Sequence, residues 1–416
     1  MSAFACEPYQ GSEPEVGWQW AVQMARFHDV TVVTQSKNRR NIEQALVGLR
    51  QRQPIPRFVY FDRAKFLQRL RKRRWGLQLY CMLWHRAART FIGDLHRAEP
   101  FDLMHHVTIA GFRYQAAICG HGVPTVWGPV GGIENSPLQL LPWGAPLVLL
   151  PELVRNVHND MQYWPLSNLG SRLKAITSTL ASTREMQGLI EAKGHKARVM
   201  PTIGLRTNEI AFRPRGVTQG PLKLLYVGNL IPLKGMHLAI EALAASGADA
   251  TLTLIGKGNF QEAMRKRAER LQLGKRVQFL GRLPLGEVME AYQKFDVFVF
   301  PSFHDTGGYA VIEAMCNGLP VICLDCGGPA IAVRDGSGVR VPIGSRRSVI
   351  SGICAAIQTY DRNRQLLLEH GRAARQTVLE FYDWDRKGEQ LAQVYEDTVV
   401  TWDTTAGKTF EAARMQ

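Results

Sequence analysis

The chain alternates short apolar strands with helices, and this pattern runs through it twice. The first series contains six short apolar segments: 29–34, 58–61, 101–106, 124–128, 174–177 and 197–204. The second series contains five: 222–229, 251–256, 277–281, 296–301 and 320–325. Strands that alternate with helices form a parallel sheet covered on both faces. The pattern therefore predicts an α/β chain with two doubly wound, Rossmann-like sheets.

A polar, Pro/Gly-rich segment at 206–221 separates the two series, and we interpret it as a hinge. We expect a first domain over 1–206 and a second over 207–382. A helix over 383–402 is expected to pack back toward the first domain, and 403–416 is expected to be a flexible tail. Open α/β sheets bind ligands at the carboxyl ends of their strands. Two such sheets therefore predict a binding cleft between the domains.

The charge of the chain points to phosphate-rich partners. Lys and Arg number 51 against 36 Asp and Glu, a formal net charge of +15. Nucleic acid, anionic lipid and phosphorylated small molecules all suit such a surface, but the sequence has no zinc-finger spacing or RNP-like strand, so we expect no nucleic acid. The segment 63–74 carries seven basic residues and no acidic one, with apolar residues at helical spacing. It predicts a basic amphipathic helix that either contacts an anionic membrane or packs its apolar side on the domain.

Other sequence features favour a cytoplasmic location. No apolar stretch reaches the length of a membrane-spanning helix, and Glu7 and Glu13 interrupt the start, so we expect no signal peptide. The first residues are expected to lie within a strand. Seven cysteines, an odd number, fit free thiols. Cys323 and Cys326 have no second ligand pair, so we expect no zinc site.

The most informative segment is PSFHDTGGYAVIEAMCNGLPVI, residues 301–322. Asp305 lies in a loop after a strand, and Gly307 and Gly308 precede a helix whose amino end favours an anion. Glu313 is the only charged residue from Tyr309 to Cys323, so it either faces a polar cleft or is buried at a cost. Its two acceptor oxygens suit the two hydroxyls of a ribose.

A second anion site is indicated by VGNLIPLKG, residues 227–235. The strand ends at Gly228, and Lys234 comes just before a helix that begins near Met236. A cation there opposes the helix dipole. The lysine is favourable at this position if its ammonium and the helix end face the same anion, although an ordinary solvated lysine also fits the sequence.

The first domain repeats this arrangement in ACEPYQGSEPEVGW, residues 5–18. Gly11 shapes a turn, and Ser12 with Glu15 predicts a capping box. Gly17 lies inside the helix, which is unfavourable unless something approaches the backbone closely.

Two histidines end a strand of the first domain. Only one of His105 and His106 can point into the cleft, because side chains alternate along a strand. We favour His106, although a structural role fits either one. The turn WGPVGG, residues 127–132, contains Gly131 and suits close approach by a ligand.

Together these motifs resemble the bacterial retaining nucleotide-sugar glycosyltransferases of family 4, the glycosyl transferases group 1, which have the GT-B fold. The resemblance rests on the Lys-Gly after the first strand of the second half, the acid-x7-acid loop with glycines, the segment 5–18, the strand end HHVT and the turn WGPVGG. It covers the chain up to about Trp402. It implies a GT-B fold of two Rossmann-like domains facing across a cleft, with the donor in the C-terminal domain and the acceptor in the N-terminal one.

The resemblance also implies roles for individual residues on the donor side. Glu313 would bind the donor ribose, and Asp305 would contact the sugar hydroxyls. Lys234 would neutralise the leaving diphosphate. The remaining donor-side residues are those that would offer backbone groups or lie near the diphosphate and base: Gly228, Asn229, Leu280, Gly307, Gly308 and Tyr309.

On the acceptor side, His106 or His105 would approach the transferred sugar, with Gly11, Gly17 and Gly131 nearby. No metal or cofactor is implied, since lysine and helix dipoles take over the work of a metal ion. The sequence departs from the family at Asp305, where Glu is usual, and at Asn229, where an Arg usually joins the lysine.

The resulting expectation is a retaining transferase that moves a hexose from a nucleotide diphosphate-sugar to a saccharide or lipid-linked acceptor in cell-surface polysaccharide biosynthesis, at the inner face of the membrane. Two alternatives remain open: a GT-B sugar-nucleotide epimerase, and a nucleotide-sugar-binding homologue with little turnover.

Overall fold

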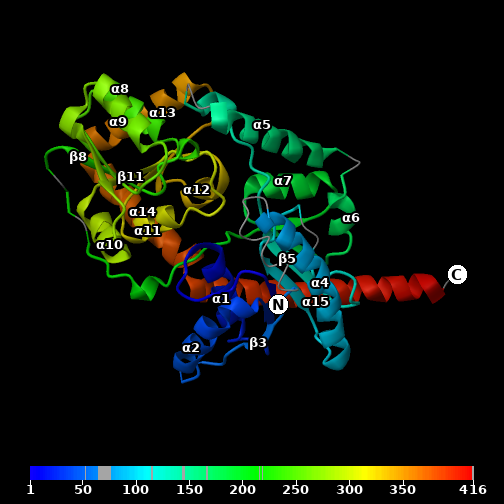
Figure 1. Ribbon diagram of the computed structural model, residues 1–416. Coiled ribbons are helices and arrows are strands. Elements are labelled where there is room, and N and C mark those ends of the chain that lie inside the picture. Colours follow the sequence, from blue (N-terminus) through cyan, green and yellow to red (C-terminus); the bar gives the residue numbers. More distant parts are fainter. Residues whose placement is uncertain are drawn as a thin grey trace. The chain divides into compact units, whose positions relative to one another are not determined.

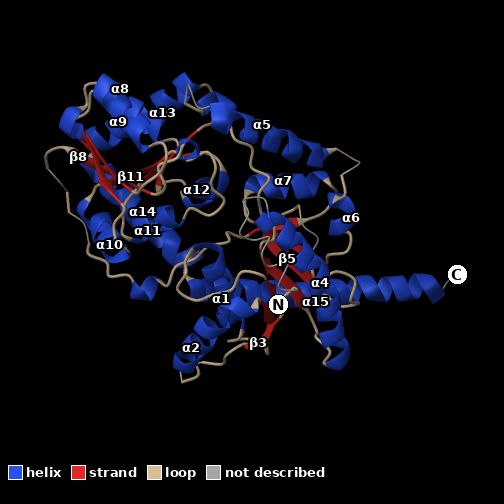
Figure 2. Cartoon of the chain, in the orientation of Figure 1, coloured by secondary structure: helices blue, strands red, loops and turns tan. Residues whose placement is uncertain are grey.

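The computed structural model describes residues 1–51, 53–63, 76–113, 116–142, 146–164, 167–214, 216–217 and 219–414. The chain forms two compact units, each built on one sheet (Figure 2). The first comprises Met1–Ile133, Gln162–Thr202 and Trp384–Gln416, and the second comprises Glu134–Met161 and Ile203–Asp383. The division differs from the expected boundaries because 134–161 and 203–206, expected in the first domain, belong to the second unit.

The first unit has a seven-stranded parallel sheet in the order β3-β2-β1-β4-β5-β6-β7. Its strands are β1 (Ser2–Ala3), β2 (Thr31–Thr34), β3 (Arg57–Tyr60), β4 (Met104–Thr108), β5 (Thr125–Val130), β6 (Ser178–Ala181) and β7 (Ala197–Val199). Its helices are α1 (Ser12–Met24), α2 (Arg39–Leu49), α4 (Gly76–Ala98), α6 (Leu169–Leu173), α7 (Arg184–Ala192) and α15 (Trp384–Arg414) (Figure 1).

The second unit has a six-stranded parallel sheet in the order β10-β9-β8-β11-β12-β13. Its strands are β8 (Leu222–Val227), β9 (Ala250–Ile255), β10 (Val277–Gly281), β11 (Val297–Phe300), β12 (Val321–Leu324) and β13 (Gly338–Val341). Its helices are α5 (Pro146–Asp160), α8 (Met236–Ser246), α9 (Gln261–Arg270), α10 (Leu285–Lys294), α11 (Tyr309–Cys316), α12 (Gly327–Ala332), α13 (Arg346–Arg362) and α14 (Arg364–Phe381).

Burial explains why these apolar runs form sheets covered on both faces. In the first unit, the neighbouring residues Val32 and Val33 of β2 belong to two different buried clusters. Side chains alternate along a strand, so the two clusters cover opposite faces of the sheet. One cluster contains Trp84 and Phe112, and the other contains Trp18. In the second unit, every residue of β11 and β12 is buried.

Three local expectations were wrong. The sixth strand is Ser178–Ala181 and not 174–177, because Lys174 ends helix α6 and its N–H donates to the carbonyl of Gly170. Helix α15 continues to Arg414, past the expected end at 402, in a segment without a proline to stop it. The capping box is absent: Ser12 makes no capping bond, and Glu15 instead accepts from the backbone N–H of Tyr9 at 2.6 Å.

Two further expectations concern the membrane and the cysteines. Residues 64–74 of the basic segment lie outside the described residues. Among the helices that the structure describes, none has the length and apolar character needed to cross a membrane. All seven cysteines are free thiols.

Candidate functional site

Each sheet has a switch point, where the strand order reverses: from there, successive strands are added toward the opposite edge of the sheet. In the second sheet this point lies between β8 and β11, and in the first it lies between β1 and β4. Open α/β sheets bind ligands outside the carboxyl ends of the strands at such a switch point. The loops after β8 and β11 therefore define the candidate site of the second unit.

Lys234 and Asp305 join these two loops. Lys234 Nζ lies 2.6 Å from Asp305 Oδ2, and each side chain is 18% exposed. The ammonium also donates to the carbonyl of His304 at 3.4 Å. Gly235, the next residue, has φ 66°, and a Cβ there would lie 2.0 Å from the carbonyl oxygen of Pro301. Only glycine allows this close approach, which sets Lys234 against the loop after β11, just before α8 begins.

Asp305 also orders the start of α11. Its Oδ1 accepts from the backbone N–H of Gly308 at 2.9 Å. Gly308 precedes the helix with φ 78°, a left-handed conformation that favours glycine. Asp305 therefore contacts both the lysine and the helix start, and the predicted residues Gly307 and Tyr309 flank this turn.

Glu313 lies on α11, one turn further along the chain. It is half-buried, and its Oε2 accepts from the hydroxyl of Tyr292 at 2.9 Å. Burial raises the pKa of the Glu313 carboxyl, and the hydrogen bond from Tyr292 lowers it in part. Among the described residues, Oε1 has no hydrogen-bond partner. One oxygen is thus fixed by Tyr292, and the other is an acceptor for a ligand hydroxyl.

The other predicted donor-side residues lie at strand ends. Gly228 follows β8, and a Cβ there would lie 2.7 Å from the Tyr226 hydroxyl. Asn229 is exposed, and its carbonyl accepts from the same hydroxyl at 2.9 Å. Leu280 near the end of β10 is 49% exposed.

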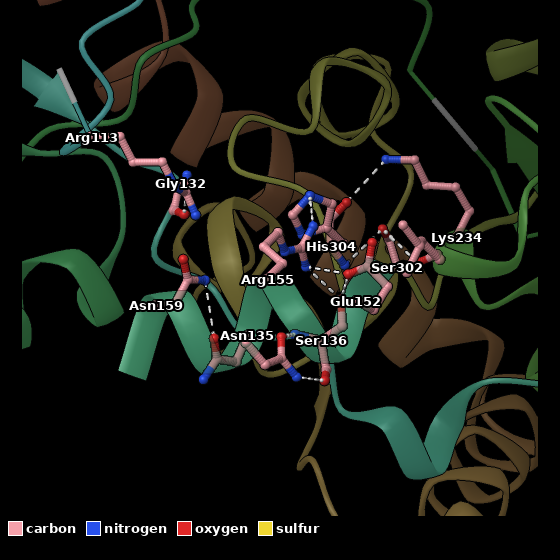
Figure 3. Close-up of polar contacts among 12 residues, drawn as sticks. Arg113, Gly132, Asn135, Ser136, Glu152, Arg155, Asn159, Lys234, Ser302 and His304 are labelled. Atoms are coloured by element: carbon pink, nitrogen blue, oxygen red, sulfur yellow. Dashed lines mark hydrogen bonds and ion pairs between the residues drawn. The ribbon is translucent and has the colours of Figure 1, made fainter. Parts of the chain in front are cut away.

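A network from α5 also holds the loop after β11, and no sequence motif predicted it (Figure 3). Arg155 Nη1 lies 2.9 Å from His304 Nε2, and Nη2 lies 2.6 Å from Glu152 Oε2. A guanidinium only donates, so His304 Nε2 accepts. Ser136 contacts both Glu152 and Arg155, at 2.8 and 2.7 Å. This network fixes the residue next to Asp305.

In the first unit, His105 is a structural residue. It is buried, its Nδ1 lies 2.7 Å from the hydroxyl of Tyr395, and its Nε2 lies 2.8 Å from the carbonyl oxygen of Gly128. Burial lowers the pKa of His105 to about 3. Both ring nitrogens are occupied, so this residue is not available for a ligand.

His106 has a different environment. It is also buried, and its ring packs on the ring of His85 with 4.7 Å between centroids. Burial lowers its pKa to about 4, although the backbone of Ile109 raises it in part. Ile109 has φ 53°, an uncommon conformation for a β-branched residue. Its N–H donates to Glu13 Oε1 at 2.7 Å, so Glu13 links the loops after β1 and β4 across the switch point. Glu13 was not among the residues predicted from the sequence.

The three predicted glycines of this unit have unequal surroundings. Gly17 meets the prediction of a close approach, but a chain segment makes it: a Cβ would lie 2.1 Å from the carbonyl oxygen of Ala5. Gly11 has φ 64° in open space before α1. Gly131 donates its N–H to the carbonyl of Ala110 at 3.4 Å.

Comparison with known proteins shows which families and structures this chain resembles. Residues 208–372 match the family model of the glycosyl transferases group 1. The glycogen synthase of Mycobacterium tuberculosis (strain CDC 1551 / Oshkosh) is 31% identical over 188 residues, 44% of this chain and 44% of that protein. The chain spans about half the length of the curated relatives it matches.

Two solved structures resemble nearly the whole chain. Sucrose-phosphate synthase from Thermosynechococcus elongatus has a TM-score of 0.57 and 17% identity and covers 95% of both chains. HepE (Alr3699) of Anabaena, in complex with UDP and glucose, has a TM-score of 0.58 and 16% identity, covering 95% of this chain and 99% of that one. The chain therefore has the GT-B fold of these structures, with two Rossmann-like units, and its second unit matches the glycosyl transferases group 1.

Proposed function

We propose that this chain is a retaining glycosyltransferase of family 4 that moves a hexose from a nucleotide diphosphate-sugar to a saccharide or lipid-linked acceptor. The observation that carries the proposal is the junction of Lys234, Asp305 and the amino end of α11 at the switch point of the second sheet. A cation and a helix start that are held together by one carboxylate suit a diphosphate.

Each residue of this site has its own role in binding the donor or in the transfer. Lys234 stabilises the charge that develops on the leaving diphosphate, as a fixed donor does in electrostatic catalysis. Glu313 accepts a ribose hydroxyl through Oε1 while Tyr292 holds Oε2. Asp305 contacts the hydroxyls of the transferred sugar, and the exposed Leu280 packs on the base.

The likeness to sugar-transferring proteins supports the donor class. HepE was crystallised with UDP and glucose, and the other two proteins are named as synthases of glycogen and of sucrose phosphate. We extend this to a nucleotide-sugar donor here. A metal-independent reaction in cell-surface polysaccharide biosynthesis, on the cytoplasmic side of the membrane, completes the proposal, with 63–74 as the segment for membrane contact.

Nucleotide binding tests the donor site. Calorimetric titration of the full chain with UDP, GDP and ADP, each with and without magnesium, is expected to give micromolar binding of one nucleotide, unchanged by the metal. Glu313→Ala and Lys234→Ala should each abolish it with the fold retained by circular dichroism. Unchanged affinity in both variants, or no binding of any nucleotide, refutes the assignment.

A further inference from the structure

A cavity of about 900 Å³ in the first unit is lined by five arginines. They come from α4, from the loop after β4 and from α6: Arg86, Arg89, Arg97, Arg113 and Arg172. The described residues that line the cavity include no Asp or Glu. The volume lies in the range of sites for small-molecule ligands.

The cavity follows one face of α4. Its lining residues on this helix recur every three or four positions, from Met82 through Arg89 and Gly93 to Arg97, which places them on one side. Because α4 precedes β4 in a parallel sheet, the amino end of α4 lies toward the carboxyl edge of the sheet. The cavity reaches this edge at His85, whose ring packs on His106.

Two glycines give the cavity its shape. A Cβ on Gly120, which has φ 79°, would lie 2.6 Å from Arg89 Nη2. A Cβ on Gly93, in the middle of α4, would lie 2.9 Å from the Cε1 atom of His121. A glycine inside a helix is unfavourable by about 1 kcal/mol relative to Ala. These positions therefore let a guanidinium and an imidazole lie close to the backbone.

The arginines differ in how they are held. Arg172 donates to the carbonyl of Phe112 at 3.0 Å. Arg113 donates to the carbonyl of Gly132 at 3.3 Å (Figure 3). Arg97 pairs with Asp94 on the outer side. In the part of the chain that the structure describes, Arg86, Arg89 and Arg172 have no carboxylate at ion-pair distance. Burial lowers the pKa of His121, and the charge of Arg89 lowers it further.

The lining therefore offers donors and positive charge with no carboxylate to accept. A neutral sugar presents hydroxyls that both donate and accept, whereas an arginine only donates. A phosphate only accepts when ionised, and the planar fork of arginine matches its oxygens. We propose that this cavity binds the phosphate or diphosphate group of the acceptor, so that the acceptor is a phosphorylated compound. This rests on the proposed transferase function, because it names the class of its second substrate.

The position of the cavity fits this role. Its end at His85, whose ring packs on His106 of β4, lies near the switch point of the first sheet, where ligands of open α/β sheets bind. A phosphate held along the arginines leaves the rest of the molecule free to extend to that point. Two sources share this chemistry: a lipid-linked diphosphate and a phosphorylated saccharide.

The test measures binding of two probes to the full chain, farnesyl diphosphate and glucose 6-phosphate, with farnesol and glucose as uncharged controls. A saturating nucleoside diphosphate occupies the donor site in every titration except those of Lys234→Ala. Farnesyl diphosphate binding alone identifies a lipid-linked acceptor, and glucose 6-phosphate binding alone identifies a phosphorylated saccharide. Arg86→Gln/Arg89→Gln should weaken probe binding at least about tenfold, since each charge-assisted hydrogen bond lost costs about that much.

Matched variants separate this site from general charge and from the donor site. Arg40→Gln/Arg184→Gln removes the same charge from α2 and α7 of the same unit, and should change probe affinity by less than about twofold, because exposed charges at a distance are screened. Lys234→Ala should retain probe binding although it loses the nucleotide. Arg97→Gln, at an exposed position, serves as a second variant if Arg89 proves necessary for folding.

Three results overturn the proposal: no binding of either phosphate compound, equal losses in the two double variants, or loss of the probe in Lys234→Ala. Failure of nucleotide binding with probe binding kept would instead refute the donor-site assignment. The two proposals therefore fail separately.

Discussion

The ion pair between Lys234 and Asp305 leads to an unusual prediction for the variant Asp305→Asn. The ammonium of Lys234 is shared between the carboxylate, 2.6 Å away, and the carbonyl of His304. An anion that binds Lys234 therefore lies close to the negative charge of Asp305, which repels it. Asparagine removes this charge but keeps an oxygen that accepts from the N–H of Gly308, so α11 keeps its start.

The magnitude follows from the distances. An anion at about 2.8 Å on the open side of Nζ would lie about 5 Å from Asp305 Oδ2, with the three atoms in line. At an effective dielectric constant between about 20 and 80, the repulsion is about 1–3 kcal/mol. The side chains are 18% exposed, so solvent screens the charges, and we expect the lower part of this range. That corresponds to binding of a nucleoside diphosphate about tenfold tighter.

The assay is calorimetric titration with the nucleoside diphosphate that the wild-type chain binds, followed by a transfer assay. Asp305→Asn should bind the diphosphate more tightly but transfer sugar poorly, because its contact with the sugar hydroxyls is lost. Lys234→Met should weaken binding at least about tenfold, since a charge-assisted hydrogen bond is lost. Asp335→Asn, at a side chain 95% exposed on the same unit, removes the same charge elsewhere and should change nothing. Weaker diphosphate binding in Asp305→Asn would show that the carboxylate positions the lysine and does not compete for it.

Three further predictions concern pH and packing. Because burial raises the pKa of Glu313 above its ordinary 4.5, nucleotide affinity should fall as the pH decreases through that raised pKa, and titrations of Glu313→Gln should lose this dependence. Gly17→Ala should lower the free energy of unfolding by about 2–4 kcal/mol through overpacking against backbone, measured in urea, whereas Gly48→Ala, in open space on α2, should be neutral or stabilising. Burial lowers the pKa of His105 to about 3 and of His106 to about 4, so the unfolded chain takes up protons at a higher pH than the folded chain. The free energy of unfolding should therefore fall as the pH drops from about 6.5 toward 4, by up to about 2.7 kcal/mol per pH unit. A free energy of unfolding that does not change over this range would contradict these pKa values.

The sequence predicted the second unit best where local signals agree. Strand β10 has the expected bounds, Val277–Gly281, and α11 begins at Tyr309, directly after the two glycines that were expected to precede a helix. Both follow from signals that act over a few residues, the short apolar run and the glycines before the helix. The same kind of local signal placed strand β6 four residues early, because Ile176 and Thr177, just after α6, are β-branched residues typical of a strand.

Contacts between distant segments were beyond the sequence. The alternation of side chains separated His105 from His106, but the hydroxyl that occupies His105 belongs to Tyr395, 290 residues later. Arg155 and His304 are 149 residues apart. No periodicity or spacing encodes such a pair, because the fold alone brings the two side chains together. The predicted site residues were those with a local signature, and the missed ones act through tertiary contacts.

The two switch points differ in the charged groups that a ligand meets there. In the second unit, the loop after β11 is held by contacts within the protein: by Lys234, by the N–H of Gly308 and by Arg155 through His304. Such a loop needs little ordering when a donor binds, which lowers the entropic cost of association. Donor binding still has an electrostatic cost, because the diphosphate must share Lys234 with the carboxylate of Asp305. In the first unit, the link across the switch point is a hydrogen bond between Glu13 and a backbone amide, and the arginine-lined cavity reaches this edge of the sheet at His85. An anionic group that enters there meets positive charge with no carboxylate among the described lining residues, so its affinity should depend on salt more steeply than that of the nucleotide.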